Sequence, residues 1–150
     1  MLTPHFTEYD LILIDCRPGI DLSVTNALTA ARWLLVPAEC SFMALDGYDH
    51  VRALQQRLNA RINPSLTLLG LLPTRYRSGT VHAQAALAEI QQQVESLQVP
   101  LRFDPIRLAV AAADAPAQGM TLADFAPTMP IAREYRHVTE QILTFLEDQP

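Results

Sequence analysis

YDLILIDCRPGIDLSVTNALTAA, residues 9–31, predicts a strand, a loop and a helix in direct succession. Leu11 to Ile14 form a continuous apolar run, which is typical of a strand that is covered on both faces. Asp21 or Ser23 is suited to cap the helix that follows. Asp15 ends the strand, where a carboxylate either holds a magnesium ion, directly or through water, or caps the next loop. The residues alone leave both interpretations of Asp15 open.

The rest of the chain alternates between strand and helix patterns. Pro37 is expected to stop the second strand, and Asn63-Pro64 to end the second helix. Strands separated by helices of about ten or more residues imply parallel pairing with crossover connections. We therefore expect one α/β domain over residues 1–150, an open, mostly parallel sheet with helices on both faces. The further strands are expected at 33–36, 66–72 and 99–103, and the further helices at 46–62, from 78 or 80 to 97, and from 128 or 130 onward.

Composition excludes several classes of protein. The net charge of −5 argues against broad nonspecific binding to nucleic acid, although a local basic patch stays open. The apolar runs are too short for a membrane span, and the first ten residues lack the basic flank and apolar core of a signal peptide. Cys16 and Cys40 form neither a CxxC pair nor a dense framework, which predicts reduced thiols in a cytoplasmic protein.

The basic residues bear directly on phosphate binding. All eleven are arginine, so the chain has no lysine. The five glycines are too far apart to form a loop that cradles phosphate. A Walker A sequence ends in Gly-Lys-Ser/Thr, so that signature is absent from these residues. The four histidines show no ligand spacing, and neither a metal site nor a Ser/His/Asp triad has positive support.

Polar residues follow three of the expected strands. Asp15, Glu39 and Thr74 fall at carboxyl ends, where open α/β sheets bind ligands, so we expect them to share one crevice. Arg75 and Arg77 follow Thr74 in a loop suited to contact a base or a phosphate, although a solvated loop explains them equally well.

Two further features admit both a functional and an ordinary interpretation. Pro18-Gly19 suits a segment that switches with a ligand, but it equally suits a plain turn. Asn26, inside a helix, either bonds outward to a ligand or is simply solvated.

Taken together, the segments 9–31, 34–47 and 68–80 resemble the ParA/Soj/MinD family of deviant-Walker P-loop ATPases, most nearly its ParA/Soj branch. The first matches the family's hydrophobic strand, Asp-Cys-Pro-Pro loop and Thr-x-Asn-Ala-Leu helix. The second and third, LLVPAECSFMALDG and LLGLLPTRYRSGT, resemble its Leu-Ile-Pro-x-Gln and Gly-x-Leu-x-Thr-x-Tyr-Asp-x-Arg-Thr stretches. The likeness weakens over 104–127, and it implies a partial P-loop NTPase or Rossmann-like three-layer sandwich.

The departures from the family pattern are specific. Arg17 stands at the first proline of the loop, Glu39 at a common glutamine, and Gln118-Gly119 at a Gly-Lys pair. The resemblance also begins at the family's second half. The family's Walker A loop with its two lysines would lie upstream of this match.

The resemblance implies roles for individual residues. Asp15 would be the catalytic acid that orders Mg²⁺, through water, near the γ-phosphate of ATP. Pro18 and Gly19 would belong to the switch loop, and Asn26 and Glu39 would lie near the dimer face or active site. Thr74 would lie near the adenine, as would Pro105. DNA contacts would come from arginines such as 75, 77, 107 and 133.

Three hypotheses follow for function. The leading one is a part of a ParA-like partitioning ATPase, serving plasmid or chromosome segregation or cargo positioning, which without a phosphate-binding loop does not hydrolyse ATP by itself. Its partners would be a second copy or another ParA-like protein, DNA, and a ParB-like or cargo adaptor protein. The second is a nucleotide-independent interaction and dimerisation module for a ParA-like partner. The third is an unrelated small α/β enzyme that uses Asp15 or Glu39 as acid or base.

Overall fold

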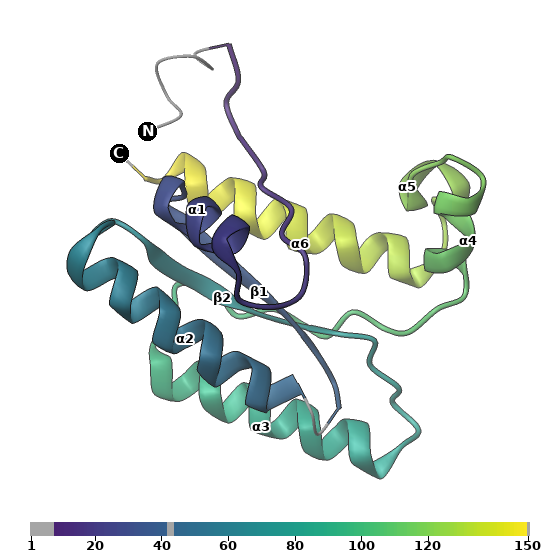
Figure 1. The fold of residues 1–150 in the computed structure, drawn as a ribbon. Helices are drawn as coiled ribbons and strands as arrows, with labels where there is room; N and C mark the ends of the chain where they lie inside the picture. Colours follow the sequence, from purple (N-terminus) through teal and green to yellow (C-terminus); the bar gives the residue numbers. More distant parts are fainter. Residues whose placement is uncertain (1–7, 42–43, 150) are drawn as a thin grey trace.

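The computed structural model describes residues 8–41 and 44–149 (Figure 1). Within these residues the chain alternates helices with two strands, and the helices dominate its second half. The elements are α1 (Leu22–Ala30), β1 (Trp33–Glu39), α2 (Ala44–Arg61), β2 (Thr67–Thr74), α3 (Val81–Leu97), α4 (Ala111–Ala117), α5 (Leu122–Phe125) and α6 (Pro130–Glu147).

The sheet of the described residues consists of β1 and β2, which are parallel and joined by the α2 crossover. Parallel pairing confirms the prediction from the strand–helix alternation. Pro37 does not stop β1 as predicted, because the strand continues to Glu39. Among the described residues β1 pairs with β2 alone, and a proline is tolerated where its nitrogen does not face the neighbouring strand. A register shift between Leu34 and Leu35 interrupts the pairing near its start.

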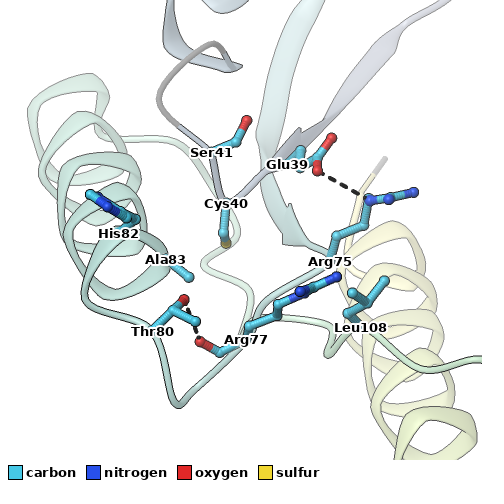
Figure 2. A pocket seen from close by; sticks show the side chains of 9 residues that line it. All are labelled: Glu39, Cys40, Ser41, Arg75, Arg77, Thr80, His82, Ala83 and Leu108. Atoms are coloured by element: carbon cyan, nitrogen blue, oxygen red, sulfur yellow. Dashed lines mark hydrogen bonds and ion pairs between the residues drawn. The ribbon is translucent and has the colours of Figure 1, made fainter.

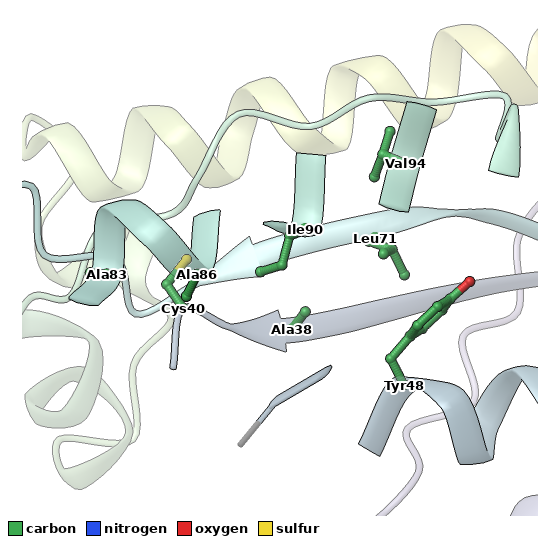
Figure 3. Packing of buried hydrophobic residues seen from close by; sticks show 8 residues of the cluster. All are labelled: Ala38, Cys40, Tyr48, Leu71, Ala83, Ala86, Ile90 and Val94. Atoms are coloured by element: carbon green, nitrogen blue, oxygen red, sulfur yellow. The ribbon is translucent and has the colours of Figure 1, made fainter. Parts of the chain in front are cut away.

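Helices cover both faces of this sheet, as predicted. On one face Ala38 and Leu71 pack against α2 and α3, whose Ile90 is almost fully buried (Figure 3). On the other face Leu72 packs against Ile131 of α6. In Figure 1, α2 and α3 accordingly lie on one side of the strands and α6 on the other. The fold is thus an α/β layer arrangement built on a parallel sheet.

The N-terminal end of α1 is fixed by Asp21, one of the two predicted caps. Its carboxylate accepts hydrogen bonds from the Val24 amide (3.0 Å) and the Ser23 hydroxyl (2.6 Å). Arg17 closes the same loop with an ion pair to Asp21 at 2.7 Å. These contacts determine how residues 17–21 turn into the helix.

Residues 11–14 do not form the predicted buried strand. They run as an extended segment outside any sheet, and all four side chains are exposed, Leu13 by 82%. A strand is stable only when a neighbour accepts and donates its ladder hydrogen bonds. No other described residue makes a backbone hydrogen bond to residues 10–14. The prediction is therefore wrong for this chain, because the described residues offer this run no strand edge.

The predicted strand at 99–103 is also absent. The segment is extended beside β2, and its Leu101 amide donates to the Leu69 carbonyl at 3.0 Å. Pro100 and Pro105 lack amide hydrogens, so a continuous ladder cannot form across this stretch. Farther along, Ile106 donates to the Pro73 carbonyl at 2.9 Å, and these scattered bonds hold the segment in place.

The helices α2, α3 and α6 agree with the predicted ranges to within a few residues, whereas α4 and α5 were not predicted. α2 begins two residues before the expected Asp46, and α3 is preceded by Thr80, one of its two expected caps. Pro130 occupies the first turn of α6 as predicted. In the described part of the chain, no helix combines the length and hydropathy needed to cross a bilayer.

Candidate functional site

The carboxyl ends of β1 and β2 bring Glu39 and Thr74 together. The two residues are register partners in the parallel pair. The Cys40 amide donates to the Thr74 carbonyl at 2.9 Å, which extends the ladder one residue past Glu39. Two of the three predicted strand-end residues therefore lie at one edge, as parallel pairing requires.

A pocket of about 260 Å³ opens at this edge (Figure 2). Its walls come from the end of β1, the loop that follows β2, the first turn of α3 and the segment after residue 106. The lining residues are Glu39, Cys40, Ser41, Arg75, Arg77, Thr80, His82, Ala83 and Leu108. The crevice predicted at the carboxyl ends of the strands thus exists at β1 and β2.

Arg75 spans the mouth of the pocket. Its φ of +54° lies in the left-handed region, which is uncommon for a residue with a side chain. Its Nε contacts a carboxylate oxygen of Glu39 at 3.2 Å, and both side chains are more than half exposed. Such a pair contributes about 0–1 kcal/mol to stability, so it orients the two side chains more than it stabilises the fold.

Arg77 gives the pocket its uncompensated positive charge. Within the described residues it forms no ion pair with a carboxylate, whereas Arg75 is offset by Glu39. Figure 2 shows its side chain between Thr80 and Leu108. The Thr80 hydroxyl donates to the Arg77 carbonyl at 3.2 Å and so ties this loop to the start of α3. A guanidinium beside hydroxyl groups is suited to a polar or anionic ligand.

Cys40 forms part of the inner wall. Burial raises the pKa of its thiol, and the neighbouring charge of Glu39 raises it further. A thiol is a nucleophile only as the thiolate, so Cys40 is a packing residue rather than a reactive one. It lies in the apolar cluster formed by β1, β2, α2 and α3 (Figure 3).

Asp15 does not join this pocket. It is exposed in the loop between the extended segment and α1, and it is not among the lining residues. Pro18 and Gly19 share the loop and are also exposed, and Gly19 has a φ of +114°. The expectation that Asp15, Glu39 and Thr74 share one crevice is therefore wrong for the described chain. Its basis was a strand at 11–14, and that strand does not form.

The two other predicted ligand contacts lie on separate elements. Asn26 is exposed on α1, outside the pocket. Pro105 is half-buried and precedes Ile106, whose amide bonds the end of β2. Pro105 therefore lies beside the Thr74 edge without lining the pocket.

Sequence reasoning assigned no ligand contact to six of the lining residues, which are Cys40, Ser41, Thr80, His82, Ala83 and Leu108. Cys40 and Ser41 directly follow Glu39, so their position after a strand was a usable signal. His82 lies in the first turn of the helix predicted after Thr80. No pattern in the sequence indicates that Leu108 lies at the pocket, because scattered hydrogen bonds rather than a periodic pattern set the path of its segment.

The arginines proposed for DNA contacts differ in availability. Arg107 is engaged with Glu134, with Nε 2.6 Å from the carboxylate. Arg133 donates to the Thr128 carbonyl at 2.9 Å. Arg75 is likewise paired with Glu39, so of these four arginines only Arg77 forms no side-chain hydrogen bond or ion pair with another described residue.

The described residues do not by themselves fit a magnesium-bound triphosphate. Among them, no three His, Cys, Asp or Glu side chains cluster as a metal site would require. The sequence has no lysine. Arg17, which lies two residues after Asp15, is paired with Asp21. A carboxylate without nearby cations repels phosphate, so the Asp15 loop alone is not a phosphate site.

Known proteins are similar to this chain in sequence and in fold. A family model described as an AAA domain matches residues 1–68. The chromosome-partitioning ATPase Soj of Thermus thermophilus is 34% identical over 140 residues, which is 93% of this chain and 55% of Soj. The chromosome partitioning protein ParA of Myxococcus xanthus is 34% identical over 103 residues, which is 66% of this chain and 36% of ParA.

A solved structure extends the likeness to almost the whole chain. Cobyrinic acid a,c-diamide synthase from Mycobacterium smegmatis superposes with a TM-score of 0.76 at 26% identity, over 98% of this chain and 52% of the synthase. Another structure of that synthase contains ADP and magnesium. The chain spans about half the length of the relatives it matches. In both sequence and fold, the chain is similar to the ParA/Soj/MinD family of P-loop ATPases.

Proposed function

We propose that this chain serves as part of a ParA-like partitioning ATPase, in the segregation of plasmids or chromosomes or in the positioning of cellular cargo. The observation that carries the proposal is the pocket at the carboxyl ends of β1 and β2, in a chain 34% identical to Soj over 140 residues. Ligands of open α/β sheets bind at this edge. The proposal implies a cytoplasmic protein that works with DNA and with a ParB-like or cargo adaptor protein.

Within this proposal the nucleotide site is divided between residues of this chain and residues outside these 150. Thr74 and Pro105 lie at the edge assigned to the adenine, and Glu39 lies beside them. Asp15 is the carboxylate assigned to the water shell of Mg²⁺, Pro18 and Gly19 form the switch loop, and Asn26 lies toward the dimer face. The phosphate-binding lysines come from residues other than these 150.

The charges of the chain explain why the phosphate-binding lysines must come from other residues. Backbone amides and a lysine neutralise the triphosphate in P-loop sites and supply most of the affinity. Neither a glycine-rich loop nor a lysine is present in this sequence. We therefore propose that the 150 residues alone neither bind ATP tightly nor hydrolyse it.

A joined polypeptide tests the assigned activity. The portion of Thermus thermophilus Soj outside the 140 matched residues is fused to this chain, and magnesium-dependent ATP hydrolysis is measured. The fusion is expected to hydrolyse ATP, and Asp15→Asn is expected to slow it by about 10²-fold, since removal of a single electrostatic contact in an active site has that size of effect.

Asp10→Asn is the matched control, because Asp10 is an exposed carboxylate in the same segment. It is expected to leave hydrolysis unchanged. A fusion that melts cooperatively but has no activity would contradict the proposal. Equal rates for the Asp15 and Asp10 variants would contradict the role of Asp15.

A nucleotide-independent interaction module is the second candidate. The observation that favours it is the exposed apolar run at residues 11–14 in a chain without lysine. Binding to Soj that is equally tight with and without ATP, together with an inactive fusion, would support this candidate over the first.

A further inference from the structure

The C-terminal half of α2 presents a groove to solvent, which we call the α2 groove. Its volume is about 510 Å³, and the exposed residues that line it are Ala53, Gln56, Arg57, Ala60 and Arg61. These positions recur at intervals of three and four residues, which places them on one face of the helix. The inner face of α2 is occupied by the core, since Leu54 and Leu58 are buried in a cluster with residues of α1. The α2 groove is therefore a surface feature that the core does not use.

The two arginines of the α2 groove have no partner among the described residues. Neither Arg57 nor Arg61 forms an ion pair or a side-chain hydrogen bond there. They lie four residues apart, and like charges at this spacing on a helix repel each other. The helix dipole accounts for Arg61 in the last turn of α2, but not for Arg57 one turn earlier. The contacts within the described chain thus leave this positive charge unbalanced.

The sequence around the α2 groove contains no acidic residue. Residues 50–88 include five arginines and no aspartate or glutamate, although the whole chain has sixteen acidic residues and a net charge of −5. No carboxylate of this stretch can therefore neutralise Arg57 and Arg61. A partner that complements the α2 groove has to bring its own negative charge.

The floor of the α2 groove indicates which kind of anion fits. Ala53 and Ala60 are seven residues apart, so they lie about two turns apart on the same face. Small side chains allow a second helix to pack closely against the first. A phosphate backbone would contact the guanidinium groups but would leave the alanine methyl groups uncovered. A helix that carries carboxylates and small side chains would contact both.

The α2 groove lies at the opposite end of the sheet from the pocket at Glu39 and Thr74. Gln55 and Asn59, on the same half of α2, donate to the Leu66 carbonyl at 3.1 and 2.9 Å, which ties this half to the start of β2. The pocket lies at the carboxyl ends of β1 and β2. Figure 1 shows α2 running back along the strands between these two ends. A partner in the α2 groove therefore leaves the pocket open.

We propose that the α2 groove is a docking surface for an acidic helix of another protein. The partner helix carries two carboxylates one turn apart, which pair with Arg57 and Arg61, and small side chains that pack on Ala53 and Ala60. Because exposed ion pairs contribute little each, the partner binds weakly and reversibly, and its binding depends on salt. The inference does not rest on the proposed function, since the groove and the pocket lie at opposite ends of the sheet.

A synthetic helical peptide tests the charge pairing on the whole chain. The probe is a labelled, alanine-rich peptide of about 20 residues with glutamates one turn apart along one face, and fluorescence anisotropy measures its binding. The expected Kd is about 100 μM or lower in about 0.05 M salt. It is expected to rise at least about fivefold in about 0.5 M salt, because added ions screen exposed pairs. The same peptide with glutamine in place of each glutamate is expected not to bind.

Two variants separate the contribution of charge from that of shape. Arg57→Glu is expected to weaken binding of the glutamate peptide by at least about tenfold, because carboxylates would then face each other. Arg136→Glu is the matched control, because it makes the same charge change at an exposed residue of α6, on the other face of the sheet. It is expected to bind the peptide as the unchanged chain does. Ala60→Phe keeps every charge and is expected to weaken binding by a similar factor to Arg57→Glu, since its ring would fill the floor of the groove.

Several results would overturn the inference. Equal binding by the Arg57→Glu and Arg136→Glu chains is one, and no saturable binding of the glutamate peptide up to about 1 mM is another. Binding of a labelled DNA duplex that is lost in Arg57→Glu but kept in Ala60→Phe would assign the groove to phosphates instead. Self-association that Arg57→Glu abolishes would assign it to a second copy of this chain. The comparison of the two peptides on the unchanged chain requires no variant, so the inference stays testable even where a variant does not fold.

Discussion

Asn63 holds α1 against the turn between α2 and β2. Its side-chain amide donates to the carbonyls of Leu28 (2.9 Å) and Ala31 (2.7 Å), and its oxygen accepts from the Ser65 hydroxyl (2.7 Å). The side chain is buried, so each group that loses its partner would stay away from water. This single residue fixes the end of α1 and thereby the helix that leads from the Asp15 loop.

Asn63→Ala is expected to lower the free energy of unfolding by about 1–3 kcal/mol, because the buried Leu28 carbonyl and the part-buried Ala31 carbonyl lose their donor. Urea unfolding measures the change. Asn26→Ala is the control, because Asn26 is exposed on α1 and alanine favours a helix. A loss of stability no larger for Asn63→Ala than for Asn26→Ala would contradict the anchoring role.

Asp21 makes the start of α1 sensitive to pH. The hydrogen bonds from Ser23 and Val24, with a smaller contribution from Arg17, hold the pKa of this carboxyl below its ordinary value near 3.8. A lowered folded-state pKa means that the cap stabilises the helix above the ordinary value and is lost as pH falls through the folded pKa.

Amide exchange in α1, measured from about pH 6 down to about pH 2, is expected to show this loss at the acid end. Asp21→Asn keeps the capping oxygen but does not titrate, so its α1 is expected to change less over the same range. Identical pH profiles for the two proteins would show that Asp21 does not carry the effect.

At the scale of elements, helices were the more predictable part. The predicted ranges 46–62 and 78 or 80 to 97 agree with α2 and α3 to within about two residues. Leu54 and Leu58 of α2 and Ile90 and Val94 of α3 are buried. A helix satisfies its own backbone hydrogen bonds, so its sequence contains most of what it needs. The run at 11–14 has the composition of a strand, but strand formation depends on an edge that no described residue supplies.

Gly70 allows the segment after α3 to lie close to β2. A Cβ at this position would come within 2.7 Å of the Leu101 carbonyl oxygen and 2.8 Å of the Phe103 ring. Gly70→Ala is expected to lower the free energy of unfolding by about 1–3 kcal/mol, since backbone must move. Thermal melting measures this.

Gly79→Ala is the control for that comparison, because a Cβ at Gly79 would meet no atom within 4 Å. Its expected effect is below about 1 kcal/mol in either direction. Equal melting temperatures for both variants would mean that the close approach beside β2 does not constrain the fold.

At the scale of the whole molecule, the candidate site was predicted in part. The edge shared by Glu39 and Thr74 followed from strand ends alone, because parallel neighbours bring their carboxyl ends together. The position of Leu108 in the pocket wall depends on the irregular path of its segment, which no periodic sequence pattern predicts. Asp15 was expected at the same edge, and its placement depends on the pairing of residues 11–14.

The central claim is that this chain carries part of a nucleotide site and that the cationic part lies on other residues. Calorimetric titration of the purified chain with ATP and Mg²⁺ tests it most directly. The account predicts no magnesium-dependent binding at nucleotide concentrations up to about 1 mM. Saturable, magnesium-dependent binding with a Kd of about 10 μM or below would contradict it.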